Sequence, residues 1–466
     1  MQECAKRKLI EDPVKKALIA FTLPILISNL FQQLYNTVDT VIVGHFIPQA
    51  LASVSTSGNL IFLLVGFFNG MAIGAGVVIS KFFGEKNYGD MRKAIHTDLA
   101  FGLVAGAVFS IAGYFLTPAI LQALQTPDEI FVYSQEYFQT YFAGAITVAL
   151  YNVCTGILQA VGDSKRPLYY LMFSSCLNIV LDLLFIGVFH WGVWAAAFAS
   201  VLSQGVSVLL CLVRLLTTKE VYRVDWKNIR FHEGMLSKIV KLGLPSGVQN
   251  SMIAIANLFV QSNVNTFSTA AISGVGCYMK LEGFAFLPIT CFSMALTTFI
   301  GQNLGAKEFE RAKQGARFGI TCSLVVAEII GVIIFAFAPV FLSLFSSDPD
   351  VIAGGVKQCR TEALFYFLLA YAHAIAGVSR GSGNASVPMV IMLSCWCVVR
   401  VIYLSIALSL QHSIEFIFIG YPATWLLSDI FFTIYYFRSD WAYSFERKEA
   451  AARAVAAQQA GENTVE

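Results

Sequence analysis

The sequence predicts an all-α polytopic membrane protein with twelve transmembrane helices in two six-helix bundles. The 466 residues are 57% hydrophobic and 13% charged, whereas a soluble domain carries about 25% charged residues. Twelve apolar runs are each long enough to cross a bilayer, which takes about 20 residues. The chain also overlays itself at an offset of 221 residues. Two bundles related by a pseudo-two-fold axis along the membrane normal are therefore expected.

The expected spanning helices follow one another through short connectors that contain Gly, Pro or charged residues. They are 18–43, 55–80, 94–116, 131–158, 167–189, 192–215, 242–266, 277–300, 316–342, 359–378, 388–409 and 414–437. The longest connector separates the two sets of six. The predicted organisation is an N-terminal bundle (1–216), a cytoplasmic loop (217–238), a C-terminal bundle (239–440) and a cytoplasmic tail (441–466).

The distribution of basic residues predicts the orientation. All lysines and arginines except Lys280, Lys357, Arg360 and Arg400 fall at the N-terminus, the even-to-odd connectors and the tail. Because positively charged loops stay in the cytoplasm, both termini and the central loop are expected there. The charged N-terminus lacks the short apolar region of a removable signal peptide. A multi-pass protein of the cell (plasma or inner) membrane is expected.

The internal repeat extends over both halves without large gaps. Pro24 falls on Pro245, and "GILQAVGDSKRP" falls on "GVSRGSGNASVP". Asn29 and Asn36 also fall on asparagines of the second half. Six spans is an even number, so both halves enter the membrane from the same side. A substrate cavity between the bundles, opened alternately to each face, is the expected consequence.

A polar stripe in the first span is the strongest candidate for a functional site. Asn29, Gln32, Asn36 and Asp39 lie on one helix face, because they are spaced three, four and three residues apart. Hydrogen bonds between helices explain the amides, but burying an ionised acid is costly without a partner. The stripe should therefore face protein or water.

The fifth span offers that partner. Asn178 and Asp182 are one turn apart, and counting 1.5 Å per residue puts Asp39 about 27 Å and Asp182 about 22 Å from the inner helix ends. The acids should meet and share a proton, or hold Na⁺ between Asp39, Asn178 and Asp182. At the 221-residue offset both acids fall on uncharged residues, so the site is expected only in the first half.

The chain resembles the multidrug and toxic compound extrusion (MATE) family over about residues 10–440. The resemblance rests on "LPILISNLFQQLYNTVDTVIVG", "SKFFGEKNYGDMRKA", "GILQAVGDSKRP" and "NIVLDLLFI". It implies an antiporter that exports drugs or other organic cations in exchange for inward H⁺ or Na⁺. Carboxylates in the first and fifth helices carry the coupling in prokaryotic members, and they match Asp39 and Asp182, with Asn178 beside them.

The family also implies further residues of the coupling or substrate pocket. Those that match here are Tyr137, Asn152 and Ser200, and Asn36 belongs to the same expected pocket. Members of the NorM type carry acids in the seventh and tenth helices. The corresponding stretches of this chain, "LPSGVQNSMIAIAN" and "LFYFLLAYAHAIAGVSRG", contain no acid. The resemblance is therefore closer to the DinF-like branch.

A second-half cavity is a separate expectation, lined by Asn257, Glu282 and Arg400. Glu282 could pair with Lys280 or with Arg400, and a structural ion pair is the preferred reading. Glu362 and His373 are further candidates, although a buried histidine is usually satisfied by its neighbours.

Other function classes are less well supported. A lipid-linked precursor flippase of the same superfamily is the alternative, but it would favour several cations for a diphosphate. An enzyme would need a catalytic motif, and no HExxH or GxSxG is present. The expected protein needs no cofactor beyond its coupling ion, binds no nucleic acid, and acts as a monomer on a small amphiphilic cation in the lipid bilayer. Substrate identity and the choice between H⁺ and Na⁺ stay open.

Overall fold

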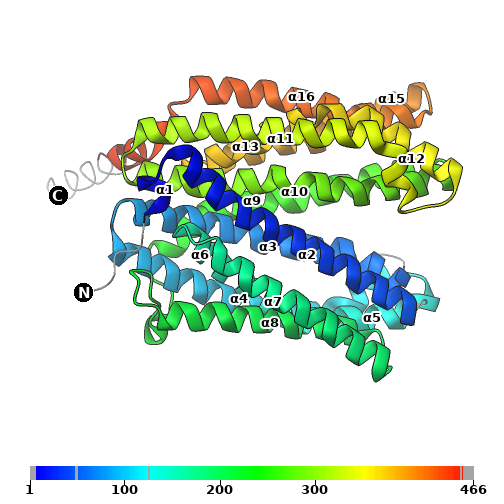
Figure 1. Ribbon diagram of the computed structural model, residues 1–466, viewed down its shortest axis with the longest axis horizontal. Helices are drawn as coiled ribbons and strands as arrows, with labels where there is room; N and C mark the ends of the chain where they lie inside the picture. The colour runs from blue at the N-terminus through cyan, green and yellow to red at the C-terminus, as the bar shows by residue number, and fades with distance from the viewer. Residues whose placement is uncertain (1–6, 48–50, 124–125, 452–453, 455–466) are drawn as a thin grey trace, which may run out of the picture.

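The computed structural model is a bundle of long helices that run side by side, with both termini at one end (Figure 1). It describes residues 7–47, 51–123, 126–451 and 454, and within these ranges it contains no β-strand. Ten of the described helices are long and apolar enough to cross a membrane, or eleven if one bent pair forms a single span. Each of the twelve expected spans coincides with a helix or with a broken helix, so the predicted all-α fold is confirmed.

The first bundle contains the first six spans, preceded by a short helix at the N-terminus. Its elements are α1 (Lys8–Glu11), α2 (Val14–Phe46), α3 (Leu51–Gly84), α4 (Tyr88–Ala123), α5 (Asp128–Ala143), α6 (Ala145–Ala160), α7 (Lys165–Asp182) with η2 (Leu183–Val188), and α8 (Trp194–Thr217).

The second bundle repeats the arrangement. Its elements are α9 (Met235–Val264), α10 (Thr269–Gly305), α11 (Phe309–Ser343), α12 (Pro349–Glu362), η4 (Ala363–Phe365), α13 (Tyr366–Gly381), α14 (Ser386–Met392), η5 (Leu393–Val399), α15 (Arg400–Leu410) and α16 (Ile414–Arg438). The connector between the bundles contains η3 (Trp226–Asn228), and η6 (Trp441–Tyr443) follows the last span.

Two of the expected spans are broken where the sequence reading made them continuous. The fourth span bends by 45° between α5 and α6, at Gly144. A Cβ on Gly144 would lie 2.2 Å from Val201, so the bend brings the backbone against α8 where only glycine fits. The tenth span changes to a short 3₁₀ turn between α12 and α13.

The two bundles are related by a pseudo-two-fold axis, as the repeat predicts. The rare left-handed backbone positions recur at the 221-residue offset: Lys86 with Lys307, and Gly162 with Gly383. Both glycines end a helix with the same pair of main-chain hydrogen bonds, the arrangement that favours glycine. The same axis relates two hydrogen bonds between the bundles. Asn29 Nδ2 of the first bundle donates to Cys291 Sγ on α10, and the equivalent Asn250 Nδ2 of the second bundle donates to the Gly66 carbonyl on α3.

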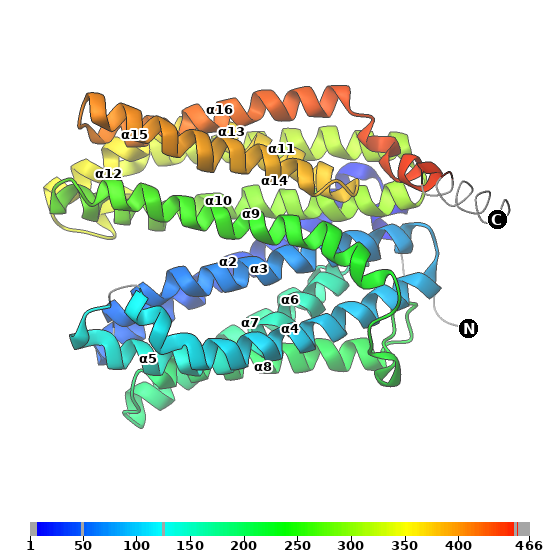
Figure 2. The same cartoon turned by 180° about the vertical axis from the view of Figure 1, so that it is seen from behind.

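The bundles close on each other in the half of the molecule nearer the termini. There α3 lies against α9, as both side views show (Figures 1 and 2). A Cβ on Gly70 would lie 2.2 Å from the Gly247 nitrogen, and one on Gly74 would lie 2.2 Å from the Gly243 nitrogen. Glycines four residues apart on both helices thus allow backbone-to-backbone contact.

The end of α3 makes a symmetric contact with the end of α10. A Cβ on Gly84 would lie 2.1 Å from the Gln302 carbonyl oxygen, and one on Gly305 would lie 2.2 Å from the Lys81 carbonyl oxygen. We call the contacts of Gly70, Gly74 and Gly84 with α9 and α10 the inner seam.

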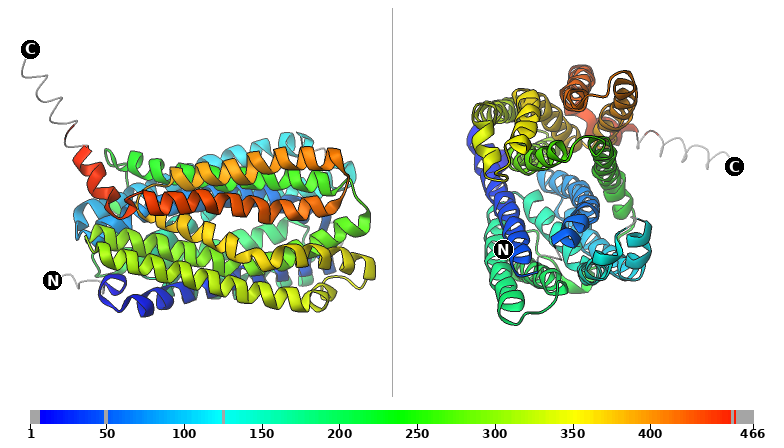
Figure 3. Two further views of the ribbon diagram at one scale, coloured as in Figure 1. Left: turned by 90° about the horizontal axis from the view of Figure 1, so that it is seen from above. Right: turned by 90° about the vertical axis from the view of Figure 1, so that its right-hand side faces the viewer.

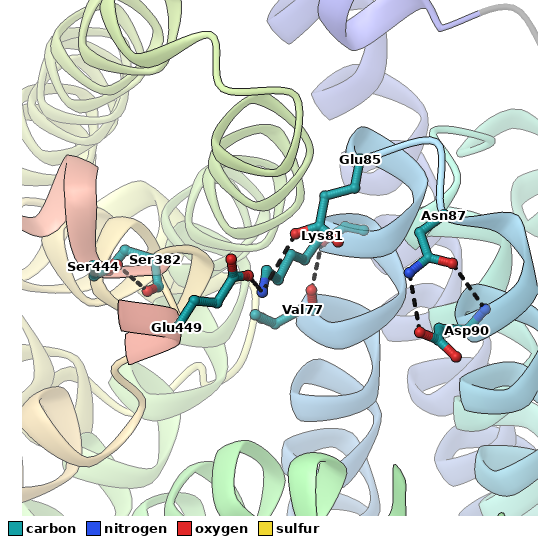
Figure 4. Close-up of polar contacts among 9 residues, drawn as sticks. Val77, Lys81, Glu85, Asn87, Asp90, Ser382, Ser444 and Glu449 are labelled. Atoms are coloured by element: carbon teal, nitrogen blue, oxygen red, sulfur yellow. Dashed lines mark hydrogen bonds and ion pairs between the residues drawn. The ribbon is translucent and has the colours of Figure 1, made fainter. Parts of the chain in front are cut away.

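Both ends of the described chain contact the helices of the inner seam. Lys81 of α3 pairs with Glu85 at 3.4 Å and with Glu449 of the tail at 2.8 Å (Figure 4). The tail is held to the second bundle by Ser444, which donates to the Ser382 carbonyl (Figure 4). At the other terminus, Arg7 donates to the Gly84 carbonyl. Figure 3 shows both ends of the described chain on this side of the molecule.

Candidate functional site

One cavity of about 590 Å³ lies within the first bundle and is closed on one side by α10 of the second. Helix α2 contributes the largest share of its wall, through the face that the polar stripe of the sequence predicts. The residues that line it are Ser28, Asn29, Gln32, Gln33, Tyr35, Asn36, Asp39, Thr40, Val65, Asn69, Ala72, Ile73, Gly76, Tyr137, Tyr141, Tyr151, Asn152, Thr155, Gly156, Gln159, Pro167, Ser200, Gln204, Leu287, Met294, Thr297 and Thr298.

The cavity wall combines aromatic rings, amides and hydroxyls with a single charge. Four tyrosines face the space: Tyr35, Tyr137, Tyr141 and Tyr151. Among the described lining residues Asp39 is the one acid, and Lys, Arg and His do not occur. Tyrosine faces and a carboxylate attract cations, so the wall is suited to a flat or amphiphilic molecule with a positive charge.

The structure brings Asp39 and Asp182 together, as the depth estimate predicts. Their carboxyl groups are neighbours that interact electrostatically with each other. Asp39 is 8% exposed and belongs to the cavity wall, while Asp182 is 0% exposed and lies behind it. Because two ionised carboxylates repel each other in a buried site of low dielectric, such a pair favours holding one proton between them.

The oxygens around this pair have few other partners. Within the described part of the chain, and apart from the contact between the acids, no group donates a hydrogen bond to either Asp182 oxygen. The same holds for Oδ1 of Asp39 and Oδ1 of Asn178. Asn178 is held by its Nδ2, which donates to Ser200 Oγ at 3.4 Å. Several carbonyl-type oxygens are thus free to accept a proton or to bind a hard cation.

The remaining residues expected in the pocket fall in two layers. Asn36, Tyr137, Asn152 and Ser200 line the cavity. Tyr137 interacts electrostatically with both acids, and Asn152 donates to the Val148 carbonyl of its own helix at 2.8 Å. Asn178 and Asp182 form the second layer, behind the wall.

Sequence reasoning missed part of this wall. It did not single out Tyr35, Tyr141 or Tyr151, or the contribution of α10 through Thr297 and Thr298. Tyr35 precedes Asn36 in the polar stripe, and that position was a usable signal. The α10 threonines could not be found in this way, because only the packing of the two bundles brings them to the cavity.

The residues expected to line a second-half cavity do not line this one. Asn257 lies on α9, Glu282 on α10 and Arg400 on α15. Arg400 is 4% exposed and donates to Thr424 Oγ1 from Nε at 3.2 Å and from Nη2 at 2.8 Å. Its guanidinium lies 4.3 Å from the centre of the Tyr421 ring.

A buried network near Arg400 joins Glu362, which the sequence analysis named, to Tyr278, Tyr366 and Gln358, which it did not. Tyr278 donates to Glu362 at 3.2 Å and contacts the Tyr366 hydroxyl at 2.9 Å. Gln358 donates to the other Glu362 oxygen at 2.8 Å. Glu282 interacts electrostatically with Glu362 and Arg400. Within the described residues, no group of three or more His, Cys, Asp or Glu is placed to hold a metal ion.

The comparison with protein families matches each half of the chain separately. The MatE family model matches residues 24–184 and again residues 245–406. The chain belongs to the MatE family. The two matches begin 221 residues apart, which confirms both the family resemblance and the duplication. Members of the MATE family are transporters, so this MATE protein is a multi-pass membrane transporter and not an enzyme.

Curated relatives of this MATE protein extend along nearly its whole length. It is 27% identical to the "Probable multidrug resistance protein YoeA" of Bacillus subtilis over 92% of this chain and 95% of the relative. It is 26% identical to the "Probable multidrug resistance protein NorM" of Thermotoga maritima over 82% of this chain and 83% of the relative. The branch within the family stays a prediction.

Solved MATE structures share the fold. The structure of "a multidrug resistance MATE family transporter of the MOP superfamily" in an outward-facing conformation matches with a TM-score of 0.87 at 22% identity, over 96% of this chain and 99% of that one. A "MOP superfamily transporter from Pyrococcus furiosus" also matches with a TM-score of 0.87, at 21% identity. The twelve-helix, two-bundle fold follows from these matches.

Proposed function

We propose that this MATE protein is a secondary active antiporter that exports organic cations in exchange for inward H⁺ or Na⁺. The observation that carries the proposal is the contact between Asp39 and Asp182 at the wall of the cavity. The pair can hold one proton, or Na⁺ with Asn178 Oδ1. Either ion reduces the negative charge that Asp39 presents to a cationic substrate.

Exchange follows when the ion and the substrate compete for the same charge. With the inner seam closed, binding of the ion at Asp39 and Asp182 weakens the attraction for the cation, which leaves on the side away from the termini. The bundles then rock so that the ion is released on the other side. Coupling requires that both ligands bind the two conformations with different affinities.

The substrate class rests on the cavity and on the relatives. A volume of about 590 Å³ falls in the range of about 300–1,000 Å³ that holds small molecules. The four tyrosines supply flat faces for aromatic cations. Relatives are named multidrug resistance proteins, which supports drug-like, amphiphilic substrates in this protein.

A lipid-linked precursor is a weaker candidate substrate. Its diphosphate would need basic side chains within the transport pathway. The described lining residues include none, and Arg400 is engaged by Thr424 and Tyr421 outside the cavity.

We also propose that both termini lie in the cytoplasm and that the protein acts as a monomer in the plasma membrane. The termini and the central connector lie at the same end of the molecule (Figure 1). That end carries most of the lysines and arginines, as cytoplasmic loops do. Residues 1–216 and 239–440 would then be the two moving bodies.

Dye efflux from proteoliposomes tests the proposal directly. A pH gradient and a Na⁺ gradient are imposed separately on the wild type, on Asp39→Asn and on Asp182→Asn. Whichever gradient drives efflux in the wild type should fail to do so in both variants, because an amide can neither share the proton nor supply the negative charge.

Asp98→Asn is the matched control. Asp98 is a buried acid of the same bundle, 1% exposed with no hydrogen bond to either oxygen within the described residues, but it does not line the cavity. It should transport as the wild type does. Gradient-driven efflux that survives in both Asp39→Asn and Asp182→Asn would exclude the carboxyl pair as the coupling site.

A further inference from the structure

A second cavity, of about 580 Å³, lies outside the transport pathway at the end of the molecule where the termini lie. It forms where the connector between the bundles folds back over the start of α4 and the end of α8. Its lining residues are Arg92, His96, Leu216, Arg223, Val224, Asp225, Trp226 and Asn228. None of them belongs to the transport cavity.

The connector is firmly packed, although it is the longest link between spans. Val221, Tyr222 and Val224 are buried in the core of the first bundle at its inner end. The Tyr222 hydroxyl accepts from Arg166 of α7 at 3.1 Å and from Arg214 of α8 at 3.4 Å. The connector thus gives the cavity a fixed wall.

Two arginines enter this cavity in the same way. Arg92 Nε donates to the Val221 carbonyl at 2.8 Å, and Arg223 Nε donates to the Leu216 carbonyl at 3.2 Å. Neither forms a salt bridge among the described residues. Each guanidinium is therefore oriented through Nε, while its terminal nitrogens are left for an external anion. That planar pair of donors matches the oxygens of a phosphate group.

The other charges of the cavity do not cancel the arginines. Asp225 is the acid in the lining, and its carboxylate accepts from the Lys227 main chain at 3.3 Å and from Asn228 Nδ2 at 2.8 Å. His96 Nε2 accepts from the Asp225 main-chain nitrogen at 3.0 Å, so this ring nitrogen carries no proton. The lining keeps a net positive charge.

Exposed aromatic side chains indicate where this cavity lies in the bilayer. Trp226 is 65% exposed and lines the cavity, and Phe231 of the same connector is 46% exposed. Exposed Trp at the ends of spanning helices is typical of the headgroup region. Basic pockets at this depth on the cytoplasmic side bind the headgroups of anionic lipids.

We propose that the cavity of Arg92, Arg223 and Trp226 binds a phosphate-bearing anion, with the headgroup of an anionic phospholipid as its source in the membrane. The phosphate would lie between the two guanidinium groups. Because the connector joins the two bundles, a lipid held here would hold the connector against the first bundle and leave the second bundle to move.

The test is lipid binding to the purified, full-length protein in detergent micelles. Phosphatidylglycerol and phosphatidylcholine are titrated separately, and bound lipid is counted by native mass spectrometry. The wild type should retain phosphatidylglycerol in preference to phosphatidylcholine. Arg92→Gln/Arg223→Gln should bind it about 30-fold more weakly, from about fivefold for each basic residue near a headgroup.

Lys227→Gln/Arg230→Gln is the matched control. It removes the same charge from the connector beside the cavity, at residues that do not line it, and should change binding less than about twofold. Equal losses in the two double variants, or equal retention of the two lipids by the wild type, would overturn the proposal. Should the glutamine variant fold poorly, Arg92→Lys/Arg223→Lys retains the charge but not the planar pair of donors, so it should still lose most of the preference for phosphatidylglycerol. Full retention of the preference in this variant would overturn the proposed guanidinium site.

Inorganic phosphate separates the two sources of the ligand. At millimolar concentration it should not displace phosphatidylglycerol, if the lipid is the natural occupant. Full displacement would support the same phosphate site with a soluble phosphate as its ligand. Both experiments measure lipid binding and not transport. A failure of the lipid-binding proposal is therefore distinguishable from a failure of the antiport proposal.

Discussion

At the residue scale, the carboxyl pair shows what helical depth alone can predict. Asp39 and Asp182 are far apart in the sequence, but α2 and α7 run in the same direction from the same end of the bundle. Counting residues along each helix therefore placed both acids at similar heights. Depth does not fix the rotation of a helix about its axis, and for that reason it could not reveal Tyr141 or Tyr151 in the cavity wall.

Tyr137 offers a test of the wall next to the acids. It is 5% exposed, lines the cavity and interacts electrostatically with Asp39 and Asp182. Tyr137→Phe removes only the hydroxyl. The variant would lose the hydrogen bond that this hydroxyl can form with a bound substrate, and a hydrogen bond of about 1 kcal/mol corresponds to about fivefold weaker substrate binding. The measurement is the dye concentration that half-saturates efflux. Tyr133→Phe, one turn away at an exposed position of α5, should leave this concentration unchanged; equal effects would assign the loss to α5 as a whole.

At the element scale, the spans were predictable and their breaks were not. Twenty apolar residues can cross a bilayer whatever their order, so composition alone located the spans. The bend at Gly144 depends on a contact with Val201 of another helix, which no local pattern records. The network of Tyr278, Glu362 and Tyr366 likewise joins residues from distant spans.

The inner seam depends on glycine for a reason that can be tested. Gly74→Val would place a branched side chain where even a Cβ lies 2.2 Å from the Gly243 nitrogen. We expect α3 and α9 to separate, and amide hydrogen exchange to become faster in both helices at the inner seam. Hydrogen exchange followed by mass spectrometry measures this change.

Gly276→Val controls for the loss of a glycine in a spanning helix. A Cβ on Gly276 of α10 meets nothing within 4 Å, so exchange in α3 and α9 should stay at the wild-type rate. If Gly74→Val also leaves the exchange unchanged, then close backbone contact does not hold the seam.

At the scale of the whole molecule, the second copy of the repeat has kept the scaffold and not the acids. The two-fold contacts of Asn29 and Asn250 hold the bundles together from both sides. The cavity lies on one side of the axis, with α10 as its main contribution from the second bundle. Comparison of the two repeats predicted that the acids occur in the first half only. The position of the cavity could not be predicted in this way, because it depends on how the two bundles pack.

The tail should bias the balance between the two conformations. Lys81 joins α3 to Glu449, and it lies 4.7 Å from the centre of the Phe445 ring. Lys81→Met removes the ion pairs with Glu449 and Glu85 but keeps the length of the side chain. Since a surface ion pair contributes up to about 1 kcal/mol, the population with an open inner seam should rise by up to about fivefold.

Spin labels at positions 86 and 307 can report this opening, because these exposed positions are equivalent in the two bundles. Lys93→Met is the control, because among the described residues Lys93 forms an ion pair only within α4, with Asp90 at 3.0 Å. A distance distribution that does not differ between Lys81→Met and Lys93→Met would mean that the tail does not hold the seam.

The inner seam also bears on the energetics of the cell. Where the Gly70 and Gly247 backbones meet, even one added carbon would overlap the opposite chain, so the space between them is narrower than a file of water molecules. In the antiporter proposed above, such a junction would resist passive leakage of protons between the bundles while no substrate is bound. An exporter that draws on a transmembrane gradient needs this insulation, since every ion that slips through uncoupled dissipates the supply without expelling anything.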